Sequence, residues 1–194
     1  SGQSLPDFLQ SHIFKPLGME DTGFYATENQ LDRLAENYEP DENGGLKVIN
    51  SPMNSRYTRP VKNTSGGGGL LSTMADYLRF CEMLRQGGQL NDHRLISKRT
   101  LTLMRQNHLA EGMWPFIMGD NVNHGFGFGL GFRVLMDPAQ MKGLGSAGEY
   151  GWSGAAKTYF WIDPQEDMIG ILMTQVMNSE SDIKDYFRAL TYQA

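Results

Sequence analysis

A serine followed by a lysine three residues later can supply both a nucleophile and its base, because one helical turn brings the amine to the hydroxyl. The chain contains a single pair with this spacing, Ser181 and Lys184. The pair lies at the start of a predicted amphipathic helix close to the end of the sequence. Because serine is a preferred residue at helix starts, we interpret Ser181 as part of that start and not as a nucleophile.

The remaining reactive residue types form no complete catalytic centre by their spacing. The four histidines lack metal-ligand spacing, so neither a metal site nor a cofactor is predicted. A Gly-x-Ser-x-Gly elbow is missing, and the most similar stretch, Gly151–Gly154, is one residue short. The four glycines at 66–69 are not followed by Lys-Ser or Lys-Thr, which argues against a P-loop. A Ser-His-Asp triad built from distant residues stays open, and adjacent acids on turns mark no glycosidase pair.

The most informative stretch is residues 148–164, GEYGWSGAAKTYFWIDP. Small residues and glycines with one tryptophan lead into an aromatic run of strand propensity that stops at Asp-Pro. Glycine where a chain enters a strand indicates that something approaches the backbone closely there. The stretch therefore predicts one side of a binding site but contains no group that would react.

Hydrophobic periodicity and capping residues predict four helices, at 5–14, 73–85, 97–107 and 180–190. Ser4, Thr73 and Ser97 are the expected N-caps, and Asp76 is placed to form a capping box with Thr73. The Lys-Pro-Leu-Gly sequence at 15–18 is expected to stop the first helix. Cys81 in the second helix is expected to be buried and inert.

Three strands and one long irregular segment complete the pattern. Glycine alternates with large apolar residues over 124–135, which predicts a strand whose glycine face is closely covered. Two further strands, 158–162 and 168–173, flank a hairpin turn. Residues 19–64 show little periodicity apart from a turn signal at 40–45. Helices, then antiparallel strands, then a helix predict an α+β fold, with an antiparallel β-sheet flanked by helices.

The composition excludes several classes of protein. Hydrophobic residues make up 40% and charged residues 20% of the chain, which is typical of a globular protein and argues against disorder. The net charge of −5 gives no electrostatic reason to expect nucleic acid or an anionic membrane as a partner. One cysteine excludes an internal disulfide, and no apolar run approaches the ~20 residues of a membrane-spanning helix.

Five segments carry a resemblance that spans nearly the whole chain: 1–9, 13–24, 65–77, 126–132 and 151–164. Pro-Leu-Gly-Met-x-Asp-Thr-x-Phe in the second and Gly-Gly-Leu-x-Ser-Thr in the third are specific when they occur together. In this order the segments resemble the serine β-lactamase-like family. That family includes class C β-lactamases, D-alanyl-D-alanine peptidases and family VIII carboxylesterases.

The resemblance implies that the site is incomplete in this sequence. In the family a Ser-x-x-Lys supplies nucleophile and base, a Tyr-x-Asn or similar element assists proton transfer, and a Lys-Thr-Gly or His-x-Gly strand closes the site. The first two elements precede the region that resembles this chain, and apart from the misplaced Ser181 pair neither occurs here. Residues 1–194 are therefore expected to be the C-terminal part of one β-lactamase-like domain. Helices and loops are expected over 1–110, and antiparallel strands plus a C-terminal helix over 111–194.

The third family element falls on Trp152-Ser153-Gly154. The resemblance implies that the backbone N–H of Ala155 donates to the oxyanion, and that Gly151 and Gly154 leave room for an acyl group. Trp152 stands where Lys or His would hold an anionic carboxylate, which resembles the carboxylesterase branch and favours a neutral ester or amide over a β-lactam. The alternative for Trp152 is an ordinary aromatic residue packed beneath a loop.

The expected activity belongs to a full-length parent, a serine hydrolase of esterase type that acts through an acyl-enzyme. The 194-residue chain alone is expected to be inactive. Two alternatives stay open: a non-catalytic ligand-binding or regulatory member of the same fold, and an unrelated antiparallel-sheet binding domain. The expected partners are a small ester, amide or β-lactam substrate, and either the missing N-terminal segment or another copy of the chain. The N-terminal segment or the other copy would cover an apolar patch that this chain is expected to expose.

Overall fold

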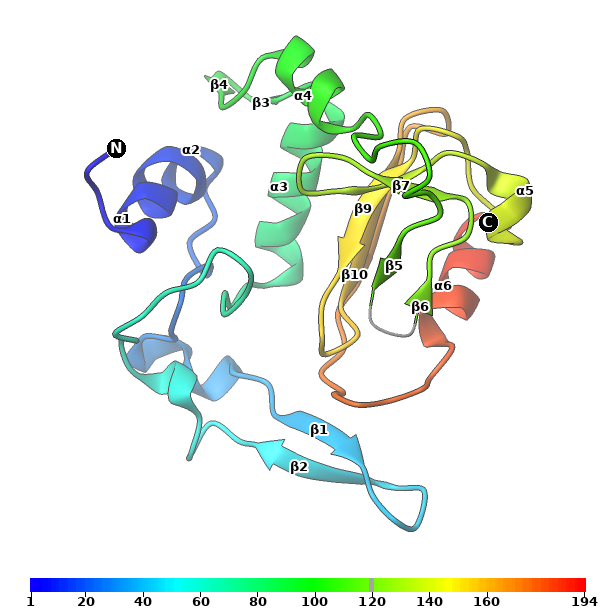
Figure 1. Ribbon diagram of the computed structural model, residues 1–194. Coiled ribbons are helices and arrows are strands. Elements are labelled where there is room, and N and C mark those ends of the chain that lie inside the picture. The colour runs from blue at the N-terminus through cyan, green and yellow to red at the C-terminus, as the bar shows by residue number, and fades with distance from the viewer. Residues whose placement is uncertain (119–120) are drawn as a thin grey trace.

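The protein is described from a computed structural model, which describes residues 1–118 and 121–194 (Figure 1). A five-stranded antiparallel β-sheet with the strand order β11-β10-β9-β8-β7 forms its centre. The five strands are β7 (Phe126–Phe128), β8 (Arg133–Leu135), β9 (Tyr150–Ser153), β10 (Tyr159–Asp163) and β11 (Met168–Leu172). Helices lie on both faces of this sheet, so the predicted α+β fold is confirmed.

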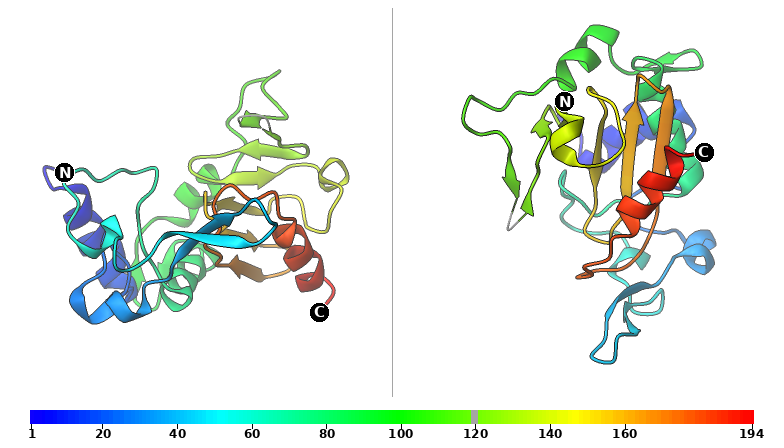
Figure 2. Two further views of the ribbon diagram at one scale, coloured as in Figure 1. Left: turned by 90° about the horizontal axis from the view of Figure 1, so that it is seen from below. Right: turned by 90° about the vertical axis from the view of Figure 1, so that its right-hand side faces the viewer.

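The helices are α1 (Leu5–Leu9), α2 (Lys15–Leu17), α3 (Met74–Arg85), α4 (Lys98–Met104), α5 (Pro138–Met141) and α6 (Ile183–Thr191). Helix α3 packs on one face of the sheet, here called the inner face, and α6 packs on the other, the outer face (Figure 2). The predicted helix at 97–107 ends earlier, at Met104, and the predicted helix at 180–190 begins later, at Ile183.

Strand β10 divides its side chains between the two faces, and all five of its residues are buried. Phe160 and Ile162 join the inner-face core together with Cys81 of α3. The Trp161 ring lies on the outer face, with its centroid 5.6 Å from that of Phe187 of α6. A strand covered on both faces is apolar throughout, which explains the unbroken aromatic run that begins at Tyr159.

A buried polar cluster fastens α6 to the outer face. Arg188 of α6 forms an ion pair with Glu149, in which Nη1 lies 2.7 Å from Oε1 and Nη2 also contacts Oε2. The Tyr192 hydroxyl lies 2.9 Å from the Glu149 carboxylate and 2.7 Å from that of Asp163. Burial lowers the pKa of Arg188, but the hydrogen bond with Glu149 and the negative charge of that carboxylate together outweigh it, so the pKa is raised overall. Arg188 therefore stays charged in the interior because Glu149 is there.

The first helix runs further than predicted. A π-helical turn at Gln10–Phe14 joins α1 to α2, and the helix ends only at Gly18, which has the left-handed φ of 67°. The ring of Pro16 would meet the carbonyl four residues earlier in a regular α-helix. The wider π turn directly before Pro16 relieves this conflict, so the proline does not stop the helix.

The segment 19–64 is more regular than predicted. Strands β1 (Asn37–Pro40) and β2 (Leu46–Asn50) form a hairpin that projects from the rest of the chain (Figure 1). The predicted turn at 40–45 is its tip, where the Asp41 carboxylate accepts hydrogen bonds from the backbone N–H groups of Asn43 and Gly45. Most of its strand residues are exposed or half-buried, so the alternating apolar pattern of a strand is missing.

The predicted strand over 124–135 is two strands, β7 and β8, joined by a tight turn. Gly131 has a φ of 91° in this turn, which favours glycine. The predicted close covering is confirmed: a Cβ on Gly127 would lie 2.5 Å from the Asn107 side chain, and one on Gly129 only 2.1 Å from the Met104 carbonyl oxygen. Two further short pairs of strands lie outside the sheet: β3 (Gln89–Leu90) with β4 (His93–Arg94), and β5 (Ile117–Met118) with β6 (Asn121–Val122).

The three expected N-caps are confirmed, but the expected capping box is not. The side chains of Ser4, Thr73 and Ser97 each accept a hydrogen bond from a backbone N–H in the first turn of their helix. The Asp76 carboxylate does not reach back to Thr73. It accepts instead from the Asp21 backbone N–H at 2.8 Å, across 55 residues of sequence.

Asp76 holds together two of the segments that carry the family resemblance. Its carboxylate also accepts from the Thr22 hydroxyl at 2.9 Å, and the Thr22 and Ser72 hydroxyls lie 2.8 Å apart. Gly23 and Leu71 exchange backbone hydrogen bonds beside them. The two motifs are therefore halves of one buried hydrogen-bonded contact.

Replacing Asp76 by alanine is expected to lower the free energy of unfolding by about 2–3 kcal/mol, because the Thr22 hydroxyl and the Asp21 N–H lose their acceptor in a buried place. Urea denaturation followed by circular dichroism measures this change. Asp92→Ala, which removes an exposed carboxylate, serves as the matched control and is expected to change stability by less than about 0.5 kcal/mol. Equal effects of the two substitutions would contradict the proposed anchoring.

The only cysteine, Cys81, is fully buried in α3, and burial raises the pKa of its thiol to about 12. Because the thiolate is the reactive form, native protein at pH 8 is expected not to react with a thiol reagent such as Ellman's reagent. Addition of guanidinium chloride should release one thiol per chain. Rapid reaction of the native protein would show that α3 opens readily.

Candidate active site

The stretch singled out by its glycines forms the hairpin between β9 and β10. Ser153 pairs with Tyr159 at the end of the two strands. Gly154 donates its N–H to the Thr158 carbonyl at 2.8 Å, and its own carbonyl accepts from the Lys157 N–H at 3.1 Å. These bonds close a tight turn over residues 154–158, with Ala155 and Ala156 at its tip.

A cleft of about 610 Å³ opens beside this hairpin. Its walls come from α1, α3, the loop before α3, the β7–β8 turn and the inner face of the sheet. Trp152, Ser153 and Gly154 line it, as do Tyr77 and Phe80 of α3. Among the residues that the structure describes, no Asp, Glu, Lys, Arg or His lines this cleft. The cleft is therefore apolar and uncharged.

Trp152 is half-buried, and its ring packs edge-on against Phe128 with centroids 5.1 Å apart. One part of the indole thus contacts the core while the residue also lines the cleft. Ser153 is exposed, and its hydroxyl has no hydrogen-bond partner within 1–118 and 121–194. Both residues are placed where they can meet a ligand in the cleft.

Gly154 and Ala155 lie where the chain leaves the cleft for the turn. A Cβ on Gly154 would lie 2.3 Å from the Thr158 hydroxyl, so a larger residue would disturb the hairpin. Ala155 is exposed, and its N–H donates to no atom of the described residues. The role of this N–H as an oxyanion donor stays a prediction.

Gly151 is buried and is not among the residues that line the cleft. A Cβ at this position would lie 2.1 Å from the Phe160 carbonyl oxygen. The close approach of β10 therefore explains this glycine without a ligand. Its expected contact with substrate stays a prediction.

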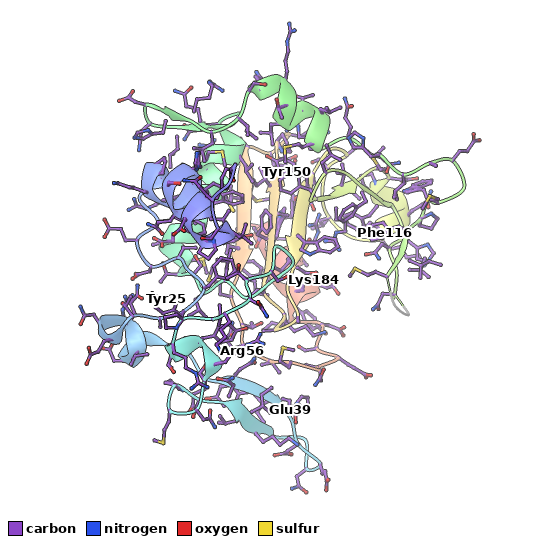
Figure 3. The ribbon with its side chains drawn as sticks, turned by 60° about the vertical axis from the view of Figure 1, so that its left-hand side comes forward. Tyr25, Glu39, Arg56, Phe116, Tyr150 and Lys184 are labelled. Carbon is purple, nitrogen blue, oxygen red and sulfur yellow. The ribbon has the colours of Figure 1, made fainter. Side chains whose placement is uncertain are left out.

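The Ser181 and Lys184 pair lies away from the cleft. The Ser181 hydroxyl oxygen accepts a hydrogen bond from the Ile183 N–H at 3.2 Å, which confirms its place at the helix start. The Lys184 ammonium lies 3.5 Å from the Asp185 carboxylate and faces the outer side of the sheet. Figure 3 labels Lys184 on α6.

Sequence reasoning missed the α3 wall of the cleft. Tyr77 packs edge-on against Phe160 at 5.2 Å, and burial raises the pKa of its hydroxyl. The helical pattern indicated a buried face here but not which part of that face borders a cleft.

No three His, Cys, Asp or Glu side chains gather into a metal-binding group in the described part of the chain. No helix within 1–118 and 121–194 is long and apolar enough to cross a membrane.

Two curated relatives match most of this chain. Protein Rv1367c of Mycobacterium tuberculosis is 34% identical over 175 residues, which cover 88% of this chain and 43% of that protein. Lovastatin esterase of Penicillium rubens is 24% identical over 217 residues, covering 100% of this chain and 52% of that protein. The chain thus spans about half the length of the curated relatives it matches.

Solved structures share the fold. EstCE1, a hydrolase with promiscuous acyltransferase activity, superposes with a TM-score of 0.79 at 25% identity and covers 97% of this chain and 50% of its own. Simvastatin synthase (LovD) from Aspergillus terreus has a TM-score of 0.78 at 22% identity, covering 98% of this chain and 50% of its own. The second likeness shows the fold alone.

The family model described as Beta-lactamase matches residues 1–193. The sheet, the two interlocked motifs and the hairpin at Trp152–Gly154 all lie within that match. The chain therefore belongs to the beta-lactamase family.

Proposed function

We propose that this chain forms the sheet side of the active site of a serine hydrolase that cleaves a small neutral ester through an acyl-enzyme. The nucleophile and its base would come from polypeptide outside residues 1–194. The observation that carries this proposal is the uncharged cleft beside Trp152, Ser153 and Gly154. The names of two relatives, an esterase and a hydrolase with acyltransferase activity, support it.

In the proposed reaction a serine hydroxyl attacks the ester carbonyl and gives its proton to a base. The carbonyl oxygen becomes an oxyanion, for which the free N–H of Ala155 is a suitable donor. The C–O bond to the alcohol then breaks, and the alcohol leaves with the proton. Water releases the acid from the acyl-enzyme in a second step of the same kind.

The neutral charge of the substrate follows from the cleft. A carboxylate that enters an apolar site loses its hydration, and without a cation in the site nothing compensates for that loss. Trp152 offers an apolar ring face and one N–H donor where a Lys would offer a full charge. An ester or amide without a nearby anionic group is thus favoured over a β-lactam.

The test uses the complete protein expressed from its gene, assayed on p-nitrophenyl butyrate and on nitrocefin. We expect kcat/KM for the ester to exceed that for nitrocefin by at least about tenfold. No turnover of either, in protein shown to be folded by circular dichroism, would contradict the proposal and favour a non-catalytic member of the fold. Faster turnover of nitrocefin would contradict the neutral substrate. Residues 1–194 alone are expected to turn over neither compound.

We also propose that the apolar cleft contacts the polypeptide that carries the nucleophile, either an N-terminal segment or another copy of the chain. Two of the large apolar side chains that line it, Leu70 and Leu130, are exposed. Residues 1–194 expressed alone are therefore expected to associate. Light scattering coupled to gel filtration measures this, and a compact, highly soluble monomer would argue against the proposal.

A further inference from the structure

A second cavity, of about 250 Å³, lies on the outer face of the sheet, away from the apolar cleft. Residues of β7, β8 and β10 line it, together with residues of α5, α6 and the segment 122–124. Its volume is below the ~300 Å³ at which pockets for drug-sized ligands begin. Only a small molecule, or one group of a larger molecule, would fit.

Cationic side chains dominate this cavity, although the protein as a whole is acidic. Four line it, Arg133, Lys142, Lys184 and Arg188, against one carboxylate, that of Asp185. The ion pair with Glu149 neutralises Arg188. Lys184 and Asp185 lie 3.5 Å apart with side chains more than a third exposed, so their attraction is weak.

Arg133 has no carboxylate partner among the described residues. Its guanidinium lies 4.0 Å from the centroid of the Phe126 ring, and Nη2 donates to the Tyr159 hydroxyl at 2.7 Å. These contacts hold the planar group in one orientation. A fixed, unpaired guanidinium is suited to bind a carboxylate or phosphate through two hydrogen bonds.

The Tyr159 hydroxyl supplies a second, independent indication. Its oxygen accepts from Arg133 at 2.7 Å and from Arg188 at 3.3 Å, and the residue is only 3% exposed. Burial raises its pKa, so the phenol keeps its proton at neutral pH. That proton has no acceptor among the residues that the structure describes. A buried donor without an acceptor is costly, and an anion in the cavity would satisfy it.

We propose that this cavity binds a small oxyanion, the carboxylate or phosphate group of a small molecule, between Arg133, Lys184 and Tyr159. The site lies on the face of the sheet opposite the apolar cleft. Binding therefore does not require the proposed ester hydrolysis.

The test titrates the complete protein with inorganic phosphate and, separately, with acetate by isothermal calorimetry, with chloride holding the ionic strength constant. Saturable binding with a Kd of about 1 mM or tighter is expected for at least one anion. Binding of phosphate alone would identify a phosphate ligand, and binding of acetate alone a carboxylate ligand. No saturable binding of either would overturn the proposal.

Matched variants locate the site. Arg133→Met and Lys184→Met are each expected to weaken binding at least about tenfold, and Tyr159→Phe about threefold to tenfold. Lys62→Met removes an exposed lysine elsewhere and should leave the Kd unchanged. Should Arg133→Met fail to fold, Lys184→Met on the half-exposed surface of α6 decides. Wild-type affinity in Lys184→Met together with Tyr159→Phe would contradict the assignment.

Discussion

Glu149→Ala is expected to destabilise the protein by about 3–5 kcal/mol, because it leaves the Arg188 charge buried without a partner. Glu149 is 1% exposed and Arg188 is 5% exposed. The substitution also takes one of two carboxylate contacts from the Tyr192 hydroxyl. A loss of this size is a large part of the 5–15 kcal/mol that stabilises a typical domain. Denaturant unfolding measures it.

Two further variants separate burial from charge. Glu82→Ala breaks a half-buried ion pair with Arg85 that solvent still reaches, and it should cost about 1 kcal/mol or less. The double variant Glu149→Leu with Arg188→Leu removes both buried charges and should recover part of the lost stability. If Glu149→Ala proved no more damaging than Glu82→Ala, the outer-face ion pair would not be what holds α6.

Ala155→Pro is expected to lower kcat for the ester by about 10²–10³ in the complete protein, because it removes the proposed oxyanion donor. Ala155 follows Gly154 in a turn closed by the Lys157 N–H and the Gly154 carbonyl. Proline is well accepted at the second position of such a turn. The substitution should therefore delete one N–H while leaving the hairpin in place.

Ala155→Gly keeps the N–H and is the matched control, expected to retain kcat within about threefold. Circular dichroism and the unfolding midpoint show whether the proline variant keeps its fold. An unchanged kcat in folded Ala155→Pro would remove this N–H from the mechanism. The rest of the proposed hydrolysis would then need a different donor.

Local features of the fold were predictable from the sequence. The caps at Ser4, Thr73 and Ser97 depend on hydrogen bonds within one helical turn, and all three are present. The hairpin between β10 and β11 was likewise indicated by strand propensity on both sides of a turn. Interactions over a few residues are encoded by the residues themselves, so neighbouring sequence suffices to predict them.

Features that depend on distant partners were missed. Asp76 is well placed for a local capping box, yet it bonds to Asp21 and Thr22 on a different segment. The β1–β2 hairpin was not expected, since its exposed strands lack an apolar alternation. The split of 124–135 into two strands was likewise not expected, since the chain reverses there at Gly131 and the two halves pair with each other.

By itself the sequence determined the fold class, the coarse order of helices, antiparallel strands and a final helix, and the position of Trp152-Ser153-Gly154, because these depend on local pattern and on motifs readable along the chain. Only the tertiary structure decided which charges are buried and which face each other. Arg188 meets Glu149 across 39 residues, and Arg133 meets Tyr159 across 26. Such pairs form when the sheet brings distant strands and a helix together, so no spacing in the sequence reveals them.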